Sequence, residues 1–371
     1  MSAPDRVAPP ALIHRPRRVL VTGGAGFIGS NLVLRLLAID SQVQITTLDK
    51  LTYAADASQL DGLHTGLHSG RHQLVVGDIC DAQLVAQLLV DHTIDTILHL
   101  AAESHVDRSI DGPAAFVQTN VVGTYTLLDA ARQVWQRGGM QEKLAKSGQS
   151  VRFHHVSTDE VFGDLGPGDP PFREDTPYQP SSPYSASKAA SDHLVRAWAR
   201  TYGLPVTLSN CSNNYGPRQH GEKLIPTVIR NCLARKPIGV YGKGDNVRDW
   251  LFVSDHADAI WHIVRHGCAG ETYNVGGSNE WSNLALVHQI CQVVADISAC
   301  EPAELHNLIH FVTDRPGHDR RYAIDASRLE AIGWLPPTPF DLGLRQTVQW
   351  YCERFALEGL VDHGRLGLHA A

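Results

Sequence analysis

Hydrophobic positions in the N-terminal half alternate between short apolar runs and longer stretches with a helical period. The short runs predict β-strands over residues 18–22, 43–48, 73–76, 96–100, 152–157 and 206–210. The longer stretches predict helices over residues 28–38, 82–91, 113–136 and 183–202. Strands that alternate with helices are typical of a parallel sheet covered on both faces. The chain therefore predicts an α/β fold built on a Rossmann-type, doubly wound parallel sheet.

The pattern changes after about Cys211, where Pro and Gly become frequent and the helical stretches are shorter. We expect a sheet domain over 17–211 and a smaller, mixed α/β substrate domain over 212–371. Segments 248–253 and 272–275 resemble strands that could rejoin either lobe, and 137–149 is predicted to be a surface loop. Residues 1–16 are rich in Pro, Ala and Arg and lack an apolar stretch, so we expect a flexible leader rather than a signal peptide.

Composition narrows the class of protein. The 43% hydrophobic and 19% charged content of the 371 residues is typical of a soluble globular protein, and the net charge of -7 argues against nucleic-acid binding. We find no apolar run of about 18 residues, so no membrane span is predicted. The seven cysteines lack a C-x-x-C spacing, which indicates reduced thiols and a cytoplasmic enzyme. The twenty histidines lack metal-ligand spacing, so we expect no metal site.

A glycine-rich turn between the first strand and the first helix indicates a dinucleotide site. Gly23, Gly26 and Gly29 let the backbone approach a pyrophosphate at the positive end of the helix. Asp49 ends the second strand, where a carboxylate accepts hydrogen bonds from ribose hydroxyls and repels a 2′-phosphate, which favours NAD over NADP. Lys50 follows directly and weakens that exclusion. Asp78 ends the third strand and can meet the adenine edge, or cap the helix over 82–91, or both.

Two pairs of residues carry the chemistry. Tyr184 and Lys188 are i, i+4 on one predicted helix, so they share a face, and the ammonium favours a phenolate that removes a proton from an alcohol. Asp159 and Glu160 follow Ser157-Thr158 at the end of a strand. Oxidation of an alcohol needs no such pair of acids, so an elimination inside a redox cycle is predicted. The alternative is that both acids are strand-end or helix-cap residues.

Several motifs resemble one family. The chain is similar to the extended short-chain dehydrogenase/reductase superfamily, and within its nucleotide-sugar branch to the dTDP-glucose 4,6-dehydratases, from about residue 17 to 328. The shared motifs are Thr22–Gly29, Asp49–Tyr53, Gly77–Ile79, His99–Asp107, Thr158–Val161, Ser182–Lys188, Asn213–Pro217, Arg248–Trp250 and Asp314–Asp319. Thr158-Asp159-Glu160 and the segment from Asp314 to Asp319 discriminate dehydratases from other members.

The resemblance implies a lyase that recycles NAD. The sugar is oxidised at C4, loses water across C5 and C6, and is reduced again at C6 to a 4-keto-6-deoxy sugar. Tyr184 would take the 4-hydroxyl proton with Lys188 beside it, and Thr158 would hydrogen-bond that hydroxyl. Glu160 would take the C5 proton, and Asp159 would protonate the departing 6-hydroxyl. The family further suggests a homodimer formed by the helices over 113–136 and 183–202, and a role in deoxysugar biosynthesis such as that of dTDP-rhamnose.

The resemblance also assigns binding residues. Expected at the cofactor are Gly23, Gly26, Phe27, Ile28, Gly29, Asp49, Lys50, Leu51, Thr52, Asp78, Ile79, Leu100, Ala101, Ala102, Ser104, Thr119, Tyr184, Lys188 and Asn214. Expected at the substrate are Ser104, Thr158, Asp159, Glu160, Asn213, Lys223, Leu224, Val240, Tyr241, Arg248, Asn283, Asp314, Arg315, His318 and Tyr322. Lys223, Arg248 and Arg315 are cations suited to a diphosphate.

Two departures from the family pattern flank the expected nucleotide pocket. The run Arg218–Gly221 replaces an aromatic and proline-containing run, and Gly239 replaces a proline. Because both departures flank that pocket, the preference of the enzyme for one nucleotide base over another stays open.

Sister enzymes of the same fold, a nucleotide-sugar 4-epimerase or a UDP-glucuronate decarboxylase, are the alternative, although neither needs the Asp-Glu pair. A non-catalytic, NAD-sensing scaffold is disfavoured because both Tyr184 and Lys188 are present.

Overall fold

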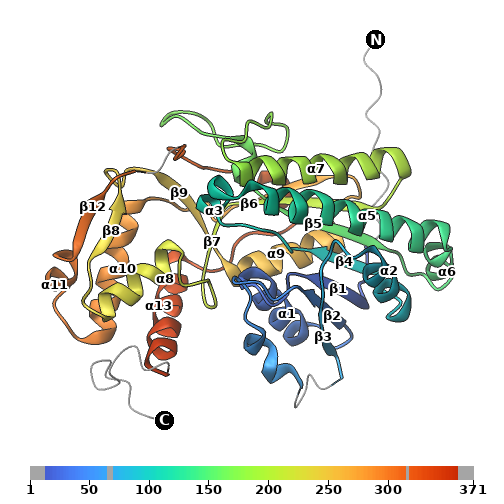
Figure 1. Ribbon diagram of the computed structural model, residues 1–371, viewed down its shortest axis with the longest axis horizontal. Coiled ribbons are helices and arrows are strands. Elements are labelled where there is room, and N and C mark those ends of the chain that lie inside the picture. Colours follow the sequence, from blue (N-terminus) through green and yellow to red (C-terminus); the bar gives the residue numbers. More distant parts are fainter. Residues whose placement is uncertain (1–12, 65–69, 315–316, 358–371) are drawn as a thin grey trace.

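A seven-stranded parallel sheet forms the centre of the first lobe (Figure 1). The computed structural model describes residues 13–64, 70–314 and 317–357. The strand order is β10-β6-β5-β4-β1-β2-β3, and it changes direction between β1 and β4, where such sheets bind ligands beyond their carboxyl ends. This order confirms the predicted Rossmann-type sheet. Its strands are β1 Arg18–Thr22, β2 Gln44–Asp49, β3 His72–Val76, β4 Thr96–His99, β5 Arg152–Thr158, β6 Val206–Cys211 and β10 Thr272–Val275.

Helices cover both faces of this sheet. Helices α1 (Phe27–Ile39) and α9 (Val253–His266) pack on one face, where Val19 and Val21 of β1 point. Helices α2 (Ala82–Asp91), α5 (Thr124–Ala131) and α7 (Pro183–Tyr202) pack on the other, together with Leu20. Successive side chains of a strand point to opposite faces, so each strand contributes to both cores. Both faces are therefore apolar, which explains why the strands read as continuous hydrophobic runs.

The helical stretch predicted over 113–136 is a continuous helical run that alternates between α-helical and π-helical segments. It consists of α4 (Pro113–Phe116), a π-helical segment (Val117–Gly123), α5 and a second π-helical segment (Arg132–Arg137), with α3 (Val106–Asp111) before it. The prediction of a loop over 137–149 is wrong in part, because α6 spans Met140–Ala145. Its apolar Met140 and Leu144 are only partly buried against the core of this face, and two such positions in six residues are too few to mark a helical period.

The second lobe is smaller and mixed. It contains a three-stranded sheet in the order β11-β9-β7 and a two-stranded sheet of β12 and β8. Its strands are β7 Asn213–Tyr215, β8 Ile238–Tyr241, β9 Val247–Phe252, β11 Glu280–Ser282 and β12 Ile309–Val312. Its helices are α8 Leu224–Leu233, α10 Asn283–Ser298, α11 Pro302–His306 and α13 Phe340–Leu357. Helix α12 (Ser327–Ala331) packs by Leu329 beside β10.

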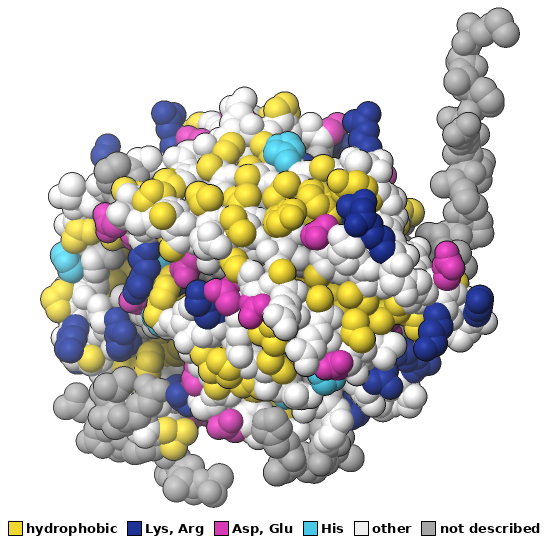
Figure 2. Space-filling view, turned by 45° about the vertical axis from the view of Figure 1, so that its right-hand side comes forward, with side chains coloured by type: hydrophobic (Ala, Val, Ile, Leu, Met, Phe, Trp, Pro, Cys, Tyr) yellow, Lys and Arg dark blue, Asp and Glu magenta, His cyan; other side chains and the backbone are white. Residues whose placement is uncertain are grey.

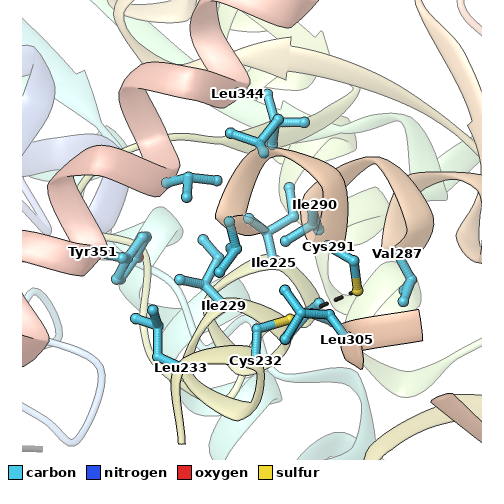
Figure 3. Packing of buried hydrophobic residues seen from close by; sticks show 14 of the residues in the cluster. Ile225, Ile229, Cys232, Leu233, Val287, Ile290, Cys291, Leu305, Leu344 and Tyr351 are labelled. Atoms are coloured by element: carbon cyan, nitrogen blue, oxygen red, sulfur yellow. Dashed lines mark hydrogen bonds between the residues drawn. The ribbon is translucent and has the colours of Figure 1, made fainter. Parts of the chain in front are cut away.

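A single apolar cluster fills the second lobe between α8, α10 and α13 (Figure 3). Ile225 and Ile229 of α8 face Ile290 of α10 in this cluster, and all three are fully buried. The thiols of Cys232 and Cys291 meet inside it, with 3.7 Å between their Sγ atoms. All seven cysteines of the chain are free thiols.

The chain passes between the lobes more than once. The segment predicted over 248–253 forms β9 in the second lobe, whereas the segment predicted over 272–275 forms β10, which pairs with β6 in the central sheet. Helix α9, between these strands, packs on α1 of the first lobe. His14, inside the expected leader, is buried and its ring nitrogens lie 2.7 Å from Ser150 Oγ and 2.8 Å from Thr96 Oγ1. The end of the leader is therefore packed against the sheet, a correction to the expectation for 1–16.

Across the described residues, no helix has both the length and the apolar character that crossing a membrane requires.

Candidate active site

The glycine turn after β1 is shaped for close backbone approach. Gly23 has a φ of +71°, and a Cβ atom there would lie 2.7 Å from Ala101 Cα. A Cβ on Gly29 would lie 2.1 Å from the Gly23 carbonyl oxygen. Thr22 Oγ1 accepts hydrogen bonds from the backbone N–H groups of Leu100 and Ala101, both at 3.2 Å, and so holds the loop after β4 beside the turn. Only glycine fits at Gly23 and Gly29.

The start of α1 suits an anion. Its N-cap is Gly26, which offers no side chain to the first N–H groups of the helix, and Phe27 and Ile28 begin the helix half-buried. Uncapped N–H groups and the helix dipole favour a phosphate group at this point. The cradle of Gly23, Gly26 and Gly29 therefore fits the pyrophosphate of a dinucleotide.

Asp49 is buried at the end of β2 and holds the turn as well as facing it. Its Oδ2 accepts the Ala25 N–H at 2.9 Å, and its Oδ1 accepts the Leu51 N–H at 2.8 Å. Leu51 has a φ of +54° and Thr52 is exposed beyond it. Asp49 thus stands beside the glycine turn, as the sequence predicts, but both of its oxygens already accept backbone hydrogen bonds.

Lys50 and Asp78 form an ion pair, with 2.7 Å between Lys50 Nζ and Asp78 Oδ2. Burial raises the pKa of Asp78, but the hydrogen bonds from Lys50 and from the Cys80 N–H outweigh it, so the pKa is lowered overall. The interpretation of Asp78 as the N-cap of α2 is wrong, because Asp81 is that cap and accepts the Leu84 N–H. The ion pair therefore holds the Lys50 ammonium group beside Asp78.

The predicted acids lie where β5 ends. Thr158 is the last residue of β5, and Asp159 and Glu160 begin the 3-10 helix Asp159–Phe162. Thr158 Oγ1 accepts the Glu160 N–H and donates to Asp159 Oδ1, both at 3.3 Å. Asn210 Nδ2 donates to the Thr158 carbonyl at 3.0 Å and fixes this strand end. The Thr158 hydroxyl therefore contacts the Asp159 carboxyl group and the backbone of Glu160.

Burial raises the pKa of Asp159 and so favours its protonated form. Its side chain is 1% exposed, and its pKa is raised well above the ordinary value by burial and then by the nearby charges of Glu160 and Asp249. Arg248 and a hydrogen bond to Thr158 act in the opposite direction but do not prevail. Among the described residues, Asp159 Oδ2 has no hydrogen-bond partner. A protonated, unpartnered carboxyl group is suited to donate a proton.

Tyr184 and Lys188 begin α7. Pro183 occupies the first turn, and Ser182 and Ser185 form a capping box that fixes where the helix starts. Both Tyr184 and Lys188 are buried, and Lys188 Nζ donates to the Val156 carbonyl of β5 at 2.8 Å. The helix therefore presents the pair beside the strand that carries the two acids.

The protein raises the pKa of Tyr184 rather than lowering it. Burial is the main cause, followed by the charge of Glu160 and by Cys211, whereas a hydrogen bond with Thr158 lowers the pKa. The expectation that the Lys188 ammonium favours the phenolate is therefore incomplete for the protein alone, because loss of water around the phenol outweighs it.

Arg248 and Tyr322 lie on the other side of the two acids. Arg248 is buried in β9, with its guanidinium carbon 4.2 Å from the centre of the Tyr322 ring. Its Nη1 and Nη2 donate to the carbonyls of Val247 and Asp319 at 2.8 and 2.9 Å. Burial and the charge of Glu160 raise the pKa of Tyr322, whose hydroxyl donates to Asp319. Five predicted site residues therefore meet here, namely Asp159, Glu160, Tyr184, Arg248 and Tyr322.

Three expected residues pack their side chains into the hydrophobic cores. The side chains of Leu224 and Val240 pack in the core of the second lobe, and Ile79 is buried against Gly123 of the π-helical segment. The prediction did not distinguish backbone from side chain at these positions. Arg315 lies outside the described residues.

Other expected residues are partly exposed or contact a loop of the other lobe. Thr119 is half-buried in the π-helical segment, Ala102 is half-buried after β4, and Asn283 is half-buried at the first turn of α10. Lys223 Nζ donates to the carbonyl of the exposed Ser104 at 3.5 Å, and so bridges the two lobes.

A polar group of the second lobe forms around His318. Its Nδ1 lies 2.7 Å from Asp314 Oδ1, and its ring centre lies 6.2 Å from that of the exposed Tyr241. At the start of that lobe, Asn214 Oδ1 lies 2.8 Å from His256 Nδ1, and Asn213 Oδ1 is buried without a hydrogen-bond partner among the described residues. Asn213 thus offers an acceptor to a ligand.

The segment that departs from the family pattern packs against α13. Arg218 has a φ of +73° and places its guanidinium 5.9 Å from the centre of the Trp350 ring. The Tyr351 hydroxyl donates to the Gln219 carbonyl. Gly239 is exposed in β8, and a Cβ there would make ordinary contacts only.

Sequence reasoning missed Asn120. This residue lies in the π-helical segment, and its Nδ2 donates to Ser187 Oγ of α7 at 2.8 Å and to the Glu103 carbonyl at 3.0 Å. Its Oδ1 accepts the Glu103 N–H at 2.9 Å. Asn120 thus ties the loop after β4 to the helix of Tyr184. No signal in the sequence marks Asn120, because its neighbours Gln118 and Thr119 are also polar and the π-helical turn that holds it is visible only in the fold.

Among the described residues, no group of three or more His, Cys, Asp or Glu side chains is placed to hold a metal ion. The buried His154 of β5 contacts hydroxyl groups of β6, with ring nitrogens 2.9 Å from Thr207 Oγ1 and 3.1 Å from Ser209 Oγ.

A parallel Rossmann sheet, a glycine cradle and a buried Tyr-Lys pair define a dinucleotide-dependent enzyme of the short-chain dehydrogenase/reductase class. The family model described as GDP-mannose 4,6 dehydratase matches residues 20–347. The chain belongs to this family, and within it to the dTDP-glucose 4,6-dehydratases.

Three relatives illustrate the match. dTDP-glucose 4,6-dehydratase 1 of Escherichia coli K12 is 52% identical, over 90% of this chain and 92% of its own. The solved dTDP-glucose 4,6-dehydratase DesIV of Streptomyces venezuelae is 41% identical with a TM-score of 0.80, over 92% of this chain and 99% of its own. The Bacillus anthracis enzyme, solved in complex with NAD, is 38% identical with a TM-score of 0.79 over the same shares.

Proposed function

We propose that this protein is a hydro-lyase that converts dTDP-glucose into dTDP-4-keto-6-deoxyglucose and water with NAD as a recycled cofactor. The relatives named for this reaction span nearly the whole chain. Gly23, Gly26, Gly29 and Asp49 would hold the NAD, together with the loop from Leu100 to Ala102. When bound, NAD would accept a hydride from the sugar and later return it.

The observation that carries the proposal is the burial of Asp159 at the end of β5, beside Thr158 and Glu160. Elimination of the 6-hydroxyl of a hexose needs a group that gives a proton to the leaving oxygen at neutral pH. A surface aspartate is ionised there, but burial and the neighbouring charges of Glu160 and Asp249 raise the pKa of Asp159. An enzyme that only oxidises an alcohol and reduces it again has no use for such a group.

The other residues divide the remaining proton transfers. Tyr184 takes the proton of the 4-hydroxyl, and Thr158, which already hydrogen-bonds near both acids, orients that hydroxyl. Glu160 is half-buried beside Asp159 and takes the proton from C5 once C4 is a ketone. Lys223 and Arg248 contact the diphosphate, because each carries a positive charge at the junction of the lobes.

The test is turnover of dTDP-glucose against UDP-glucose and GDP-mannose by the purified protein. A 4-keto sugar develops an absorbance in alkali, which an epimer does not. We expect that absorbance with dTDP-glucose, and its loss in Tyr184→Phe. A C4 epimer, or a pentose and carbon dioxide from UDP-glucuronate, would overturn the proposal in favour of a sister enzyme.

We further propose a homodimer formed by the helical run from Pro113 to Arg137 and by α7. Val117, Val122, Tyr125 and Tyr202 on this surface are 53%, 37%, 48% and 38% exposed. Hydrophobic side chains spread across the upper half of the molecule in Figure 2, where Figure 1 places α5 and α7. Contiguous exposed apolar surface of this kind marks an interface.

A charge placed on that surface tests the dimer. Tyr125→Glu should give a monomer in analytical ultracentrifugation, whereas Tyr241→Glu, at an equally exposed tyrosine of the second lobe, should not change the mass. A Tyr125→Glu protein of unchanged mass would move the interface elsewhere.

The free thiols support a reducing compartment, and we place the reaction in the cytoplasm, at the start of deoxysugar biosynthesis such as that of dTDP-rhamnose.

A further inference from the structure

A buried carboxylate lies one helical turn after Lys188 on α7. Asp192 is fully buried, and its Oδ2 accepts hydrogen bonds from Ser157 Oγ at 2.9 Å, Tyr178 Oη at 2.8 Å and Asn210 Nδ2 at 3.2 Å. His155 Nε2 lies 3.2 Å from its Oδ1. Three elements besides α7 thus supply polar atoms to one carboxylate, which none of the steps above employs.

The surroundings of Asp192 favour its ionised form despite its burial. Burial by itself raises the pKa of Asp192, but His155, the Lys188 charge and the Ser157 hydroxyl together lower it. An ionised, buried carboxylate requires a nearby positive charge.

Lys188 has the matching need. Burial lowers the pKa of its ammonium, and Asp192 and Cys211 oppose that effect. Burial raises the pKa of the Cys211 thiol to about 12, so this thiol is uncharged at neutral pH and is no counter-ion. Among the described groups that act on Lys188, Asp192 is therefore the anion that balances it.

The remaining titratable groups around Lys188 do not replace Asp192. His155 of β5 has its pKa lowered to about 4 by burial and by Lys188, and burial lowers the pKa of His99 of β4 well below its ordinary value. Both rings are neutral at neutral pH. Arg196 lies one turn after Asp192 on α7, donates to the Tyr178 hydroxyl at 2.7 Å and is a second cation. Tyr184 lies one turn before Lys188 on the same face.

We propose that Asp192 is a positioning residue for the reaction, which keeps the Lys188 side chain charged and directed at the Val156 carbonyl, and thereby sets the alkaline limit of catalysis. The inference rests on the proposed function of Tyr184 and Lys188. Asp192 acts through Lys188 and is not itself a catalytic residue.

The sign of the effect follows from the charges. Asp192→Asn keeps the shape of the side chain but removes the anion, so the burial that lowers the pKa of Lys188 is no longer opposed. Lys188 then loses its proton at a lower pH. Less positive charge remains to stabilise the phenolate of Tyr184, so the pKa of Tyr184 rises. One unit of pKa shift changes the ratio of the two charge states about tenfold.

Two measurements test this on the whole enzyme. The first is the pH profile of kcat and KM for dTDP-glucose in the parent, Asp192→Asn and the matched control Tyr178→Phe, which loses one hydrogen bond to Asp192 but keeps its charge. The second measurement needs no substrate and follows the ionisation of Tyr184 by ultraviolet absorbance as pH is raised. For each protein, the titration curve of its own Tyr184→Phe derivative is subtracted, so that the difference reports Tyr184.

We expect the alkaline limb of kcat to move to lower pH in Asp192→Asn by about one pH unit or more, with KM little changed and the Tyr184 titration moved to higher pH. Tyr178→Phe should keep both curves in place although its thermal stability falls. An Asp192→Asn enzyme with the parental alkaline limb and parental Tyr184 titration would overturn the inference, even if it were less stable. A parent that does not dehydrate dTDP-glucose would overturn the proposed function instead, and the titration would still decide the role of Asp192.

A double-mutant cycle covers the case in which Asp192→Asn does not fold. Lys188→Met/Asp192→Asn removes both buried charges together, so it should be more stable than Asp192→Asn alone. A double variant that is no more stable would show that the two side chains are not counter-ions and would overturn the inference.

Discussion

The carboxylate of Asp49 accepts the backbone N–H of Ala25 at 2.9 Å, which joins the end of the second strand to the glycine turn. Asp49 would then have two roles, because the carboxylate that we propose binds the cofactor ribose also holds the turn proposed to receive the pyrophosphate. Loss of Asp49 should therefore affect cofactor affinity more strongly than loss of a ribose contact alone.

We expect Asp49→Ala to weaken NAD binding by about tenfold or more, because a charge-assisted hydrogen bond contributes about 1.5–3 kcal/mol. Its preference for NAD over NADP should also decrease. Isothermal titration with both cofactors measures this. Asp49→Asn should lose the preference but keep more NAD affinity, since its amide oxygen can still accept one backbone N–H. Parental affinities for both cofactors in Asp49→Ala would show that Asp49 serves the turn only.

Tyr184→Phe should lose turnover by a factor of about 10² to 10⁴ while it still binds dTDP-glucose with near-parental affinity. In the proposed reaction the phenolic oxygen would take the 4-hydroxyl proton, whereas the ring itself remains buried against Phe116, with 6.4 Å between ring centres. Stopped assays measure the turnover, and calorimetric titration measures the affinity for dTDP-glucose. Retention of most of the turnover would remove Tyr184 as the base.

Asp159→Asn should stop the reaction after oxidation at C4. The amide cannot give a proton to the departing 6-oxygen, so the reduced form of the cofactor should accumulate on the enzyme and be visible by absorbance. We expect a loss of about 10² to 10⁴ in overall rate. Full turnover without accumulation would mean that another group protonates the leaving oxygen.

Glu160→Gln should suppress the exchange of the C5 proton with solvent. In deuterium oxide the parent should incorporate deuterium at C5 of the product, and the variant should incorporate it at a rate lower by about 10² or more. Nuclear magnetic resonance of the product detects the label. If both Asp159→Asn and Glu160→Gln dehydrate dTDP-glucose at near-parental rates, the acids are structural and an epimerase becomes the better assignment.

The raised pKa of Asp159 has a consequence for stability. The folded protein binds the Asp159 proton more tightly than the unfolded chain, so this residue makes the protein less stable as pH rises above the unfolded pKa. We expect Asp159→Asn to raise the free energy of unfolding at pH 7 by on the order of 1 kcal/mol or more, and by less near pH 4. Denaturant titrations at both pH values measure this. Asp245→Asn, at an exposed aspartate of the second lobe, is the control and should change little. A variant of Asp159 that is no more stable than the parent at pH 7 would contradict the protonated state.

The first lobe was predictable because its strands are buried on both faces. Arg18–Thr22 and Ala82–Asp91 have the bounds that the sequence predicts, since an unbroken apolar run or a clear helical period marks each of them. Helix α6 has six residues and packs only Met140 and Leu144, both partly buried, against the core, so it is too short to carry such a mark.

The candidate site was predictable only where a motif carries it. Thr158 to Glu160 and Tyr184 to Lys188 occur at recognisable spacings, and the structure brings them to one place. Asp192 was not found, because an acid on a helix is usually exposed and only the fold reveals that β5 and β6 bury it. The pKa of Tyr184 escaped prediction for the same reason, since loss of water depends on contacts that spacing does not contain.

The return of the chain to the central sheet affects how the protein can be made. Strand β6 acquires its outer neighbour only when Thr272–Val275 has been synthesised, after β7, β8 and β9 of the other lobe. Helix α9, which covers α1, is also late in the chain. A nascent chain on the ribosome therefore exposes an unpaired strand edge and an apolar helix face until most of its length has emerged. We expect the dinucleotide lobe to complete its folding late in translation, and a chaperone that binds apolar segments to meet it before then.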